Sequence, residues 1–381
     1  MDTIAGPGFC EGRGGVDPTS TLIRGLSSDA SGFMYFITGP DDKRLVARVD
    51  PQSRVTFVDV PDLRNPRQRR GPPANAELSG STMASDGTGG LFLALGNTLM
   101  RIQPSGAYEP VAGPFLQSTD KEARSSGDGG PARDARFKRI LAVVADRSGN
   151  LFVADEAAAG DAFRVRLINR SAGEIRAGGS AGLKTIAPGH IDTVESIRGD
   201  GPVLEATSGR LYAAYREPHK SVSTIRLVNL SSETISAHGN RLDPARSVVL
   251  TARQGRGPSQ LARIKRPPAM AGDAQGSLFV ADESGDRILE IDVQGRLSTF
   301  AGGIGRSFNG NDRKATLAAL NRPNDLAIAA TGELLISDAG NRQIRLVDSS
   351  GTIRSGPGAN AGLTWDCGGA SNSGPAARPS G

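Results

Sequence analysis

Short apolar runs, each opened by Gly, recur along the chain at nearly even spacing. The run "LFVAD" occurs at 151–155 and again at 278–282, and four looser copies follow the same pattern. An apolar run of this length between turn residues is typical of a buried β-strand and is too short for a helix. The pattern therefore indicates one structural unit repeated along the chain. The copies are "GFMYFIT" (32–38), "GLFLAL" (90–95), "GNLFVAD" (149–155), "GRLYAAY" (209–215), "GSLFVAD" (276–282) and "GELLISD" (332–338).

The segments around each copy repeat as well. A short apolar segment and a turn precede the run, and two alternating strands follow it, as in "QIRLVDS" (343–349) and "TIRSG" (352–356). A unit of four short antiparallel strands cannot bury both of its faces alone, so neighbouring units must stack. The sequence therefore predicts an all-β, six-bladed β-propeller of four-stranded antiparallel blades with long inter-blade loops. The expected blades are 22–59, 80–112, 139–179, 202–238, 268–302 and 324–356.

The two ends of the chain offer rival ways to close the ring. "DTIAG" (2–6) reads as a strand with no blade in front of it, and such a strand could complete blade six. "TIRSG" (352–356) predicts a strand for the same place, and both possibilities stay open at this point. Residues 1–357 are expected to form a single domain, and the Gly-, Ser- and Pro-rich stretch 358–381 is expected to be a tail.

Two segments carry a resemblance to a known family. "ISDAGNRQIRLVDSSGTIRSGPG" (336–358) resembles an NHL repeat, and "SSGDGGPARDARF" (125–137) is similar to a connector of bacterial and teneurin-type NHL propellers. Residues 308–328 resemble a second, degraded copy of that connector. The resemblance covers nearly the whole chain. It implies the fold far more than an activity, since NHL domains mostly bind proteins, RNA or ligands, whereas related six-bladed folds include lactonases and an amidating lyase.

Composition narrows the choice of partner. The net charge is +5, and Arg supplies most of the 45 basic residues. A basic surface can attract nucleic acid, but the Arg residues are spread over every repeat, and aromatic residues, at 4%, are too few to suit base stacking. These features argue against nucleic acid as the partner.

The sequence also bears on the location of the protein. No stretch is long and apolar enough to cross a membrane, and no secretory leader is visible, so we expect a cytoplasmic protein, or an extracellular one if the chain is a trimmed fragment. Cys10 and Cys367 lie just after the rival closing strands. They are expected to be free thiols in the cytoplasm and could be bridged in an oxidising compartment.

The ligand site is expected on one face of the ring. In a propeller, the loops from strand four to the next blade and from strand two to strand three gather around the channel on the same side, here called the top face. Long ordered loops often carry function, and the first set is long in this chain. The loops in question are 59–79, 113–139, 179–202, 239–267 and 303–323.

Blade four supplies the first candidate residues. Its "YREPHKS" (215–221) replaces the Asp of the other blades and brings together Tyr215, Arg216 and His219. Such a set can serve as acid, base and anion clamp. The alternative is an exposed turn that has drifted in sequence and collected polar residues.

Carboxylates at the ends of strands supply the second group. Asp282 and Asp338, with Asp155, end the second strand of their blades, where converging carboxylates could hold Ca²⁺ or could instead close a local turn. Asn324 and Asp325, in "NRPNDLAI", enter the innermost strand of blade six near the channel mouth. There a resemblance to gluconolactonase-like propellers implies binding of a divalent metal and a lactone, whereas NHL repeats have a similar entry that binds no metal.

Histidine offers a further metal hypothesis. The three His residues, His190, His219 and His238, could hold zinc, but no His-x-His or His-x-x-x-His spacing supports this.

We therefore expect a non-catalytic recognition module, a monomeric ring without a cofactor, that binds a protein or a small ligand through its top face. The alternative is an enzyme in the channel mouth, such as a lactone or ester hydrolase assisted by a Ca or Zn ion, or a lyase. The expected ligand-binding residues are Tyr215, Arg216, His219, Asp282, Asn324, Asp325 and Asp338.

Overall fold

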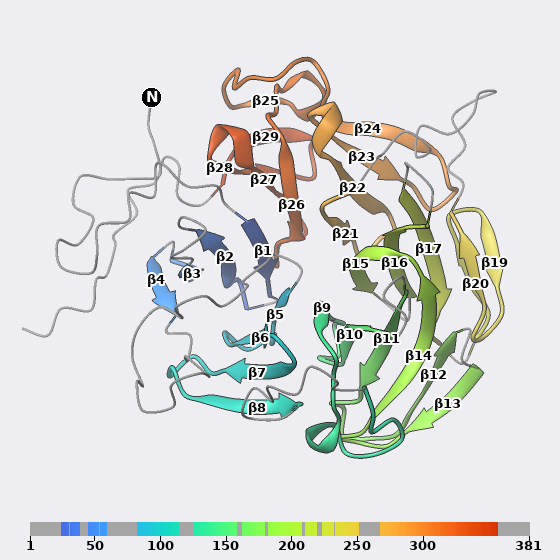
Figure 1. The fold of residues 1–381 in the computed structure, drawn as a ribbon. Coiled ribbons are helices and arrows are strands. Elements are labelled where there is room, and N and C mark those ends of the chain that lie inside the picture. Colours follow the sequence, from blue (N-terminus) through green and yellow to red (C-terminus); the bar gives the residue numbers. More distant parts are fainter. Residues whose placement is uncertain are drawn as a thin grey trace, which may run out of the picture.

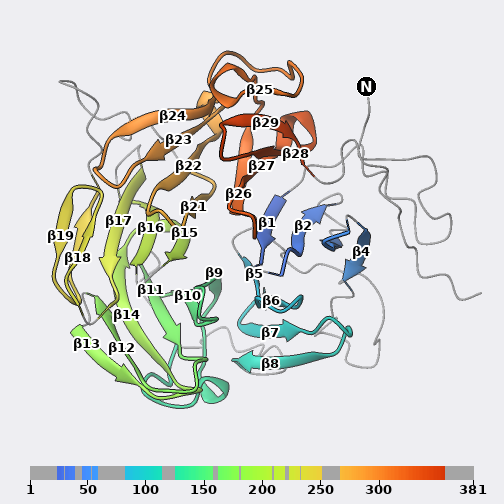
Figure 2. The same ribbon diagram turned by 180° about the vertical axis from the view of Figure 1, so that it is seen from behind.

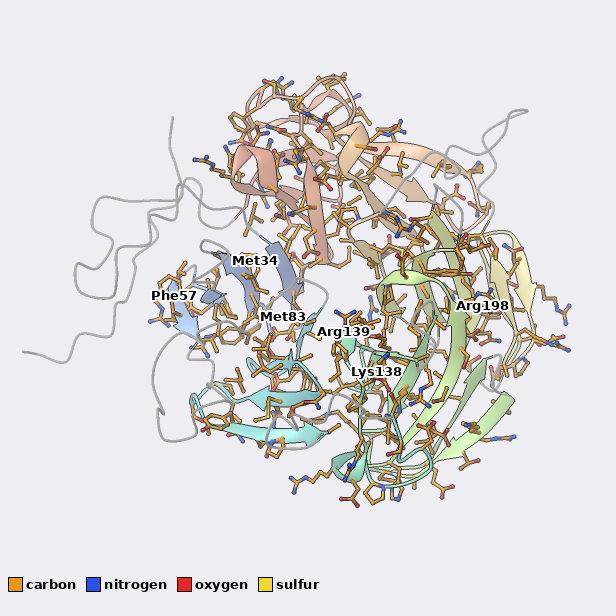
Figure 3. The ribbon with its side chains drawn as sticks, viewed as in Figure 1. Met34, Phe57, Met83, Lys138, Arg139 and Arg198 are labelled. Carbon is orange, nitrogen blue, oxygen red and sulfur yellow. The ribbon has the colours of Figure 1, made fainter. Side chains whose placement is uncertain are left out.

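The fold is a ring of six antiparallel sheets around a central axis. Figure 1 shows this ring along its axis, Figure 2 shows it from behind, and Figure 3 adds side chains to the view of Figure 1. Within the ranges described below, the helical elements are 3₁₀ turns of three residues such as η3 (Ala132–Asp134), and the predicted all-β, six-bladed propeller is confirmed. The computed structural model describes residues 24–29, 31–38, 45–52, 54–58, 82–113, 125–157, 162–179, 182–207, 210–218, 223–231, 233–250 and 267–356.

Blades one, two and five consist of four strands in chain order from the axis outward. Blade one contains β1 (Arg24–Ser28), β2 (Met34–Thr38), β3 (Leu45–Val49) and β4 (Val55–Val58). Blade two contains β5 (Met83–Ser85), β6 (Leu91–Leu95), β7 (Thr98–Ile102) and β8 (Tyr108–Ala112). Blade five contains β21 (Met270–Gly272), β22 (Leu278–Asp282), β23 (Arg287–Ile291) and β24 (Leu297–Gly302).

Blade six carries a short additional strand at its outer edge. Its four main strands are β26 (Pro323–Ile328), β27 (Leu334–Asp338), β28 (Gln343–Val347) and β29 (Thr352–Ser355). The two-residue strand β25 (Arg313–Lys314) pairs with the outer side of β29. The place beside β28 is therefore taken by the 352–356 segment, and the rival segment 2–6 lies outside the described residues, as do Cys10, Cys367 and the stretch 358–381.

Blades three and four differ from the prediction, because each contains an inserted hairpin. The segment expected to be the fourth strand of blade three forms β12 (Ile175–Gly179), which pairs with β13 (Gly182–Ile186) in a separate two-stranded sheet. The fourth strand is instead β14 (Ile191–Arg198), which pairs with β11. Blade three is thus β9 (Ile140–Ala145), β10 (Leu151–Glu156), β11 (Ala162–Ile168) and β14.

Blade four repeats this arrangement. Its strands are β15 (Asp200–Thr207), β16 (Arg210–Arg216), β17 (Ser223–Asn229) and β20 (Ser247–Val249), and its hairpin is β18 (Ile235–Ala237) with β19 (Asn240–Leu242). The segment 179–202 is therefore mostly hairpin and outer strand, and only Gly199 links blade three to blade four. The expected long top-face loop between these two blades was wrong.

One side-chain type at the end of strand three accounts for the hairpins. Where that residue is Asp, as at Asp348, its Oδ1 accepts hydrogen bonds from the N–H groups two and four residues later, and this closes a tight turn into strand four. In blades three and four the residue is Asn. The Asn169 Nδ2 donates to Gly173 O and Ile186 O, both at 2.8 Å, so one amide joins the turn before β12 to the last residue of β13. Asn229 Nδ2 does the same with Glu233 O and Leu242 O.

The long connector before blade three is fixed by a buried arginine. Arg166, in the middle of β11 and fully buried, donates to Asp128 Oδ1, Arg136 O and Ser126 O, each at 2.9 Å. Its guanidinium lies 4.9 Å from the centre of the Phe137 ring. Residues 125–137 of the connector thus fold around a strand-three side chain.

The connector before blade six uses the same device. Arg345 is fully buried in β28, donates to Gly310 O at 2.9 Å and to Asn311 Oδ1 at 3.2 Å, and lies 4.8 Å from the centre of the Phe308 ring. Apolar side chains from both connectors complete the cores between blades. Those from the first are Ala132, Ala135 and Phe137, between blades two and three, and those from the second are Ala315, Ala318 and Leu320, between blades five and six.

The ring closes where blade six packs against blade one. Leu26 and Met34 of blade one share a buried core with Leu335 and Leu346 of blade six. Near the axis the backbone N–H of Leu26 donates to Asp325 Oδ2 at 2.7 Å. The Ser28 hydroxyl donates to Ile328 O at 2.5 Å across the same seam. Among the described residues, closure therefore depends on side-chain packing and on hydrogen bonds such as these. No helix of the described part is long and apolar enough to cross a membrane.

We expect Arg166→Met to destabilise the protein by roughly 3–5 kcal/mol, because it removes the guanidinium that pairs with Asp128 at 2.8 Å and leaves the fully buried Asp155, 3.6 Å away, without that charge. Urea unfolding followed by circular dichroism measures the change. Arg296→Met is the matched control, since Arg296 pairs with Asp292 at the surface with 74% of its side chain exposed, and we expect a change of about 0.5 kcal/mol or less. Equal effects of both changes would contradict the role given to Arg166.

We expect Asn169→Asp to loosen the β12–β13 hairpin, because Asp lacks the two N–H donors and places carboxylate oxygens against two carbonyl oxygens. The cost should be roughly 1–3 kcal/mol for each unsatisfied buried group. Hydrogen exchange should show faster amide exchange in 175–186 and little change in β9 and β10. Asp348→Asn, in an exposed turn, is the control, and unchanged exchange in Asn169→Asp would refute the explanation.

Candidate functional site

The innermost strands of all six blades line a central channel. Residues of β1, β5, β9, β15, β21 and β26 surround a cavity of about 1430 Å³. The channel stays open because many of its lining residues are small and the larger apolar side chains pack between blades. The small residues that line it include Gly25, Ala84, Ala142, Ala145, Ala206, Ala269, Ala271, Gly272, Ala327 and Ala329.

Glu205 is an acidic group in the channel wall on the β15 side. Its Oε1 accepts a hydrogen bond from the backbone N–H of Gly272 in β21 at 3.0 Å, so the carboxyl joins blades four and five near the axis. Burial raises the pKa of Glu205 to about 8, although the Gly272 N–H and the charge of Arg147 act in the opposite direction. The side chain meets solvent only in part, and at neutral pH most of the carboxyl is protonated.

Asp325 holds a similar position at the seam between blades six and one. It accepts hydrogen bonds from the backbone N–H groups of Leu26 at 2.7 Å and Leu326 at 2.8 Å. Burial raises its pKa to about 7, and the bonds from these N–H groups act against the rise. Its neighbour Asn324 also lines the channel, and the buried Asn324 Oδ1 has no hydrogen-bond partner.

The wall of the channel is acidic although the chain as a whole is basic. The described residues that line it include six Asp and three Glu but only two Arg, Arg147 and Arg322, and Arg322 is paired with Glu283. The net charge of the whole chain is +5. The channel therefore differs in sign from the protein around it.

The candidate residues of blade four do not meet at the channel. Tyr215 is buried between blades three and four, where its ring contacts Phe163 edge-on and its hydroxyl accepts from Arg226 Nη2 at 3.1 Å. Arg216 lies at the surface and is paired with Asp200. His219 lies outside the described residues.

The aspartates that end strand two are engaged in their own blades. Asp282 accepts from Gly285 N at 3.2 Å and from Arg287 Nε at 2.9 Å. Asp338 accepts from Asn321 N at 2.7 Å and from Asn341 Nδ2 at 2.8 Å, and burial raises its pKa to about 6. These contacts match the alternative in which Asp closes a local turn and holds the incoming connector.

The structure places two of the three histidines. His238 is buried, with Nε2 2.9 Å from Tyr212 Oη and Nδ1 2.7 Å from Asp292 O, and burial lowers its pKa. Because a carbonyl only accepts, Nδ1 carries the proton and Nε2 accepts from the tyrosine. His238 thus ties the β18–β19 hairpin to blade five.

Metal ligation by the described residues is not supported by their arrangement. His190 Nδ1 lies 3.0 Å from Pro188 O. Within the ranges described, no three or more His, Cys, Asp or Glu residues gather closely enough to hold a metal ion.

Sequence reasoning missed Glu205. The segment "DGPVLEAT" (200–207) was expected to begin blade four, but a charged residue inside an innermost strand was not singled out. The signal was present, because Val203, Glu205 and Thr207 alternate with Leu204 and Ala206, and alternate residues of a strand face the same side.

Comparison with known proteins agrees with the architecture. No family model matches the sequence. Teneurin-4 from Homo sapiens is 23% identical over 351 residues, a match that covers 84% of this chain and 12% of teneurin-4. The chain thus spans only a small part of the length of that relative.

Among solved structures, a protein of unknown function from Bacteroides thetaiotaomicron has a TM-score of 0.50 at 13% identity, over 88% of this chain and 70% of that one. A gluconolactonase from Xanthomonas campestris has a TM-score of 0.45 at 12% identity, over 88% of this chain and 86% of that one. At such identities the likeness concerns the fold alone.

Proposed function

We propose that this protein is a recognition propeller that binds a small ligand, or a side chain of a partner protein, in the central channel and its top mouth, without catalysis. The observation that carries the proposal is the open cavity of about 1430 Å³ with polar groups on its wall. Concave sites with a few placed polar groups among apolar residues are the usual ligand sites of proteins. Asn324 and Asp325 are the expected binding residues that reach this channel.

The other candidate groups already have hydrogen-bond partners within the protein, which supports binding over catalysis. The Tyr215 hydroxyl, both nitrogens of His238 and the carboxylates of Asp282 and Asp338 already have protein partners. A catalytic acid, base or nucleophile must reach the atom on which it acts. We further propose that the blades are of the NHL type, which the match to teneurin-4 supports.

A second candidate function is acid catalysis in the channel. Glu205 and Asp325 have pKa values of about 8 and about 7, which are the values that suit a general acid at neutral pH. A lyase or a lactone hydrolase of this kind would lose turnover in Glu205→Gln or Asp325→Asn. A recognition module would show no turnover to lose.

The binding proposal predicts that narrowing the channel abolishes ligand binding. Val144→Trp in β9 and Val203→Trp in β15 place a large ring on the channel wall, whereas Val249→Trp makes the same change at an exposed position of β20. In a thermal-shift screen of small molecules of mixed charge, some compounds should raise the Tm of the wild type and of Val249→Trp, but not of the two channel variants.

Circular dichroism shows whether each variant keeps its strands. The proposal fails if no compound raises the Tm of the wild type, or if every stabilising compound acts equally on all four proteins.

The buried acids predict a pH-dependent stability. The folded-state pKa values of Glu205 and Asp325 lie above the usual values of 4.5 and 3.8, so the folded protein keeps these protons when the unfolded chain has lost them. Their contribution to the free energy of unfolding is therefore fully present below about pH 4 and falls as the pH rises to about 8. We expect Glu205→Gln to gain roughly 1–3 kcal/mol relative to the wild type between pH 5 and pH 8.

Urea unfolding at the two pH values measures this difference. Glu233→Gln, at an exposed turn of blade four, should follow the wild type at both. Parallel pH profiles for Glu205→Gln and the wild type would show that Glu205 ionises normally in the folded protein.

A further inference from the structure

Two carboxyl groups of the channel are held by backbone N–H groups alone. The partners of Glu205 and Asp325 are backbone N–H groups of Gly272, Leu26 and Leu326, and neither carboxyl forms an ion pair with a described Lys or Arg. Of the other acids of the wall, Asp86 pairs with Arg101 and Glu283 pairs with Arg322. A buried carboxylate without a cation is costly, so a cation that entered the channel would find two unpaired sites.

An acceptor oxygen without a donor lies next to each of these carboxyls. Thr207, two residues after Glu205 in β15, is 4% exposed and lines the channel, and its Oγ1 has no hydrogen-bond partner. Asn324, directly before Asp325 in β26, presents an Oδ1 that is likewise buried without a partner. Buried polar atoms normally have partners, so both atoms indicate donors that are supplied from outside the chain.

The position at Glu205 and Thr207 lies where the innermost strands of blades four and five come close together. A Cβ added to Gly272 would meet Thr207 Cγ2 at 2.8 Å and Glu205 Oε1 at 3.4 Å. Gly272 therefore lets the innermost strands come close enough for its N–H to hold one carboxyl oxygen of Glu205. The position of the carboxyl is thus fixed before any ligand arrives.

We propose that the channel binds an elongated organic cation with two or more ammonium groups, one at Glu205 and Thr207 and another at Asp325 and Asn324. The inference rests on the proposed function, in which the channel takes a ligand. An ammonium group has three N–H donors and no acceptor, which suits positions that offer only a carboxylate and acceptor oxygens. The excess of acids along the wall attracts such a cation into a protein that is basic as a whole.

The two positions favour an elongated amine over a single metal ion. They lie on the innermost strands of blades four and six, which are not neighbours in the ring. Ca²⁺ gathers six to eight oxygen ligands around one point, and the described acids do not cluster in that way. A flexible chain with ammonium groups along it can reach both positions at once.

Binding should release protons. Arg147, after β9, and Tyr212, opposite Glu205 in β16, lie near Glu205, and Arg210 and Asp273 lie near Tyr212. Asp325 faces the backbone of β1. An ammonium group beside either acid favours its ionised form, so the acid gives up its proton as the cation binds.

Isothermal titration calorimetry with spermine as the probe tests the inference, at pH 7 and low salt, in two buffers of different ionisation enthalpy. We expect binding with proton release, a loss of affinity of about tenfold or more in Glu205→Gln and in Asp325→Asn, and a smaller loss in the isosteric Thr207→Val. Glu233→Gln, an exposed acid away from the channel, should bind as the wild type does. Suberate, a dianion of extended shape, should not bind.

The outcomes separate this inference from the proposed function. Equal losses in Glu233→Gln and Glu205→Gln, or binding without proton release, would reduce the effect to surface charge and overturn it. Binding of Ca²⁺ but not spermine, with the same dependence on Glu205 and Asp325, would replace the amine by a metal. If spermine fails while other compounds still distinguish Val144→Trp from Val249→Trp, only the cation inference falls. Spermine binding that Val144→Trp leaves unchanged would place the site outside the channel and contradict both.

Discussion

The fold depends on filling the seams between blades. Sheets that meet at a central axis diverge toward the rim, so each seam needs additional side chains at its outer end. Between blades two and three, and between blades five and six, a connector supplies them, held by Arg166 or Arg345. At the seam between blades three and four, the hairpin β12–β13 packs Ala177 and Ile186 against blade four. At the seam between blades four and five, His238 binds the hairpin β18–β19 to blade five.

The same packing leaves the axis available for binding. Because apolar side chains serve the seams, the innermost strands contribute small residues and a few polar groups to the wall. Glu205 and Asp325 each accept N–H groups from the neighbouring blade, so they stabilise seams and at the same time present an acidic group to the channel. Their raised pKa values reflect this double position, since each is enclosed by protein and lacks a basic partner.

Some residues of this site were predicted from the sequence and others were not. Asn324 and Asp325 were singled out because they enter an innermost strand, and both line the channel. Tyr215 was singled out as a departure from the repeat, yet it fills the seam between blades three and four. Glu205 was missed because the first strand of blade four is not preceded by a recognisable connector. A residue that departs from the repeat pattern has different surroundings from its equivalents in the other blades. Those surroundings can be the hydrophobic core as well as a binding site.

What the sequence determined by itself is local and periodic. Six copies of one strand pattern, each opened by Gly, specify six four-stranded blades, because period and turn residues act over a few positions. Asn169 and Asn229 also favour the inserted hairpins through nearby contacts. Their difference from Asp348 can be interpreted only once the hydrogen-bond partners of the amide groups are known. Tertiary structure alone decided which buried acids lack a cation and which oxygens lack a donor. Those properties arise where strands from different blades meet, between residues such as Glu205 and Gly272 that are far apart in the sequence.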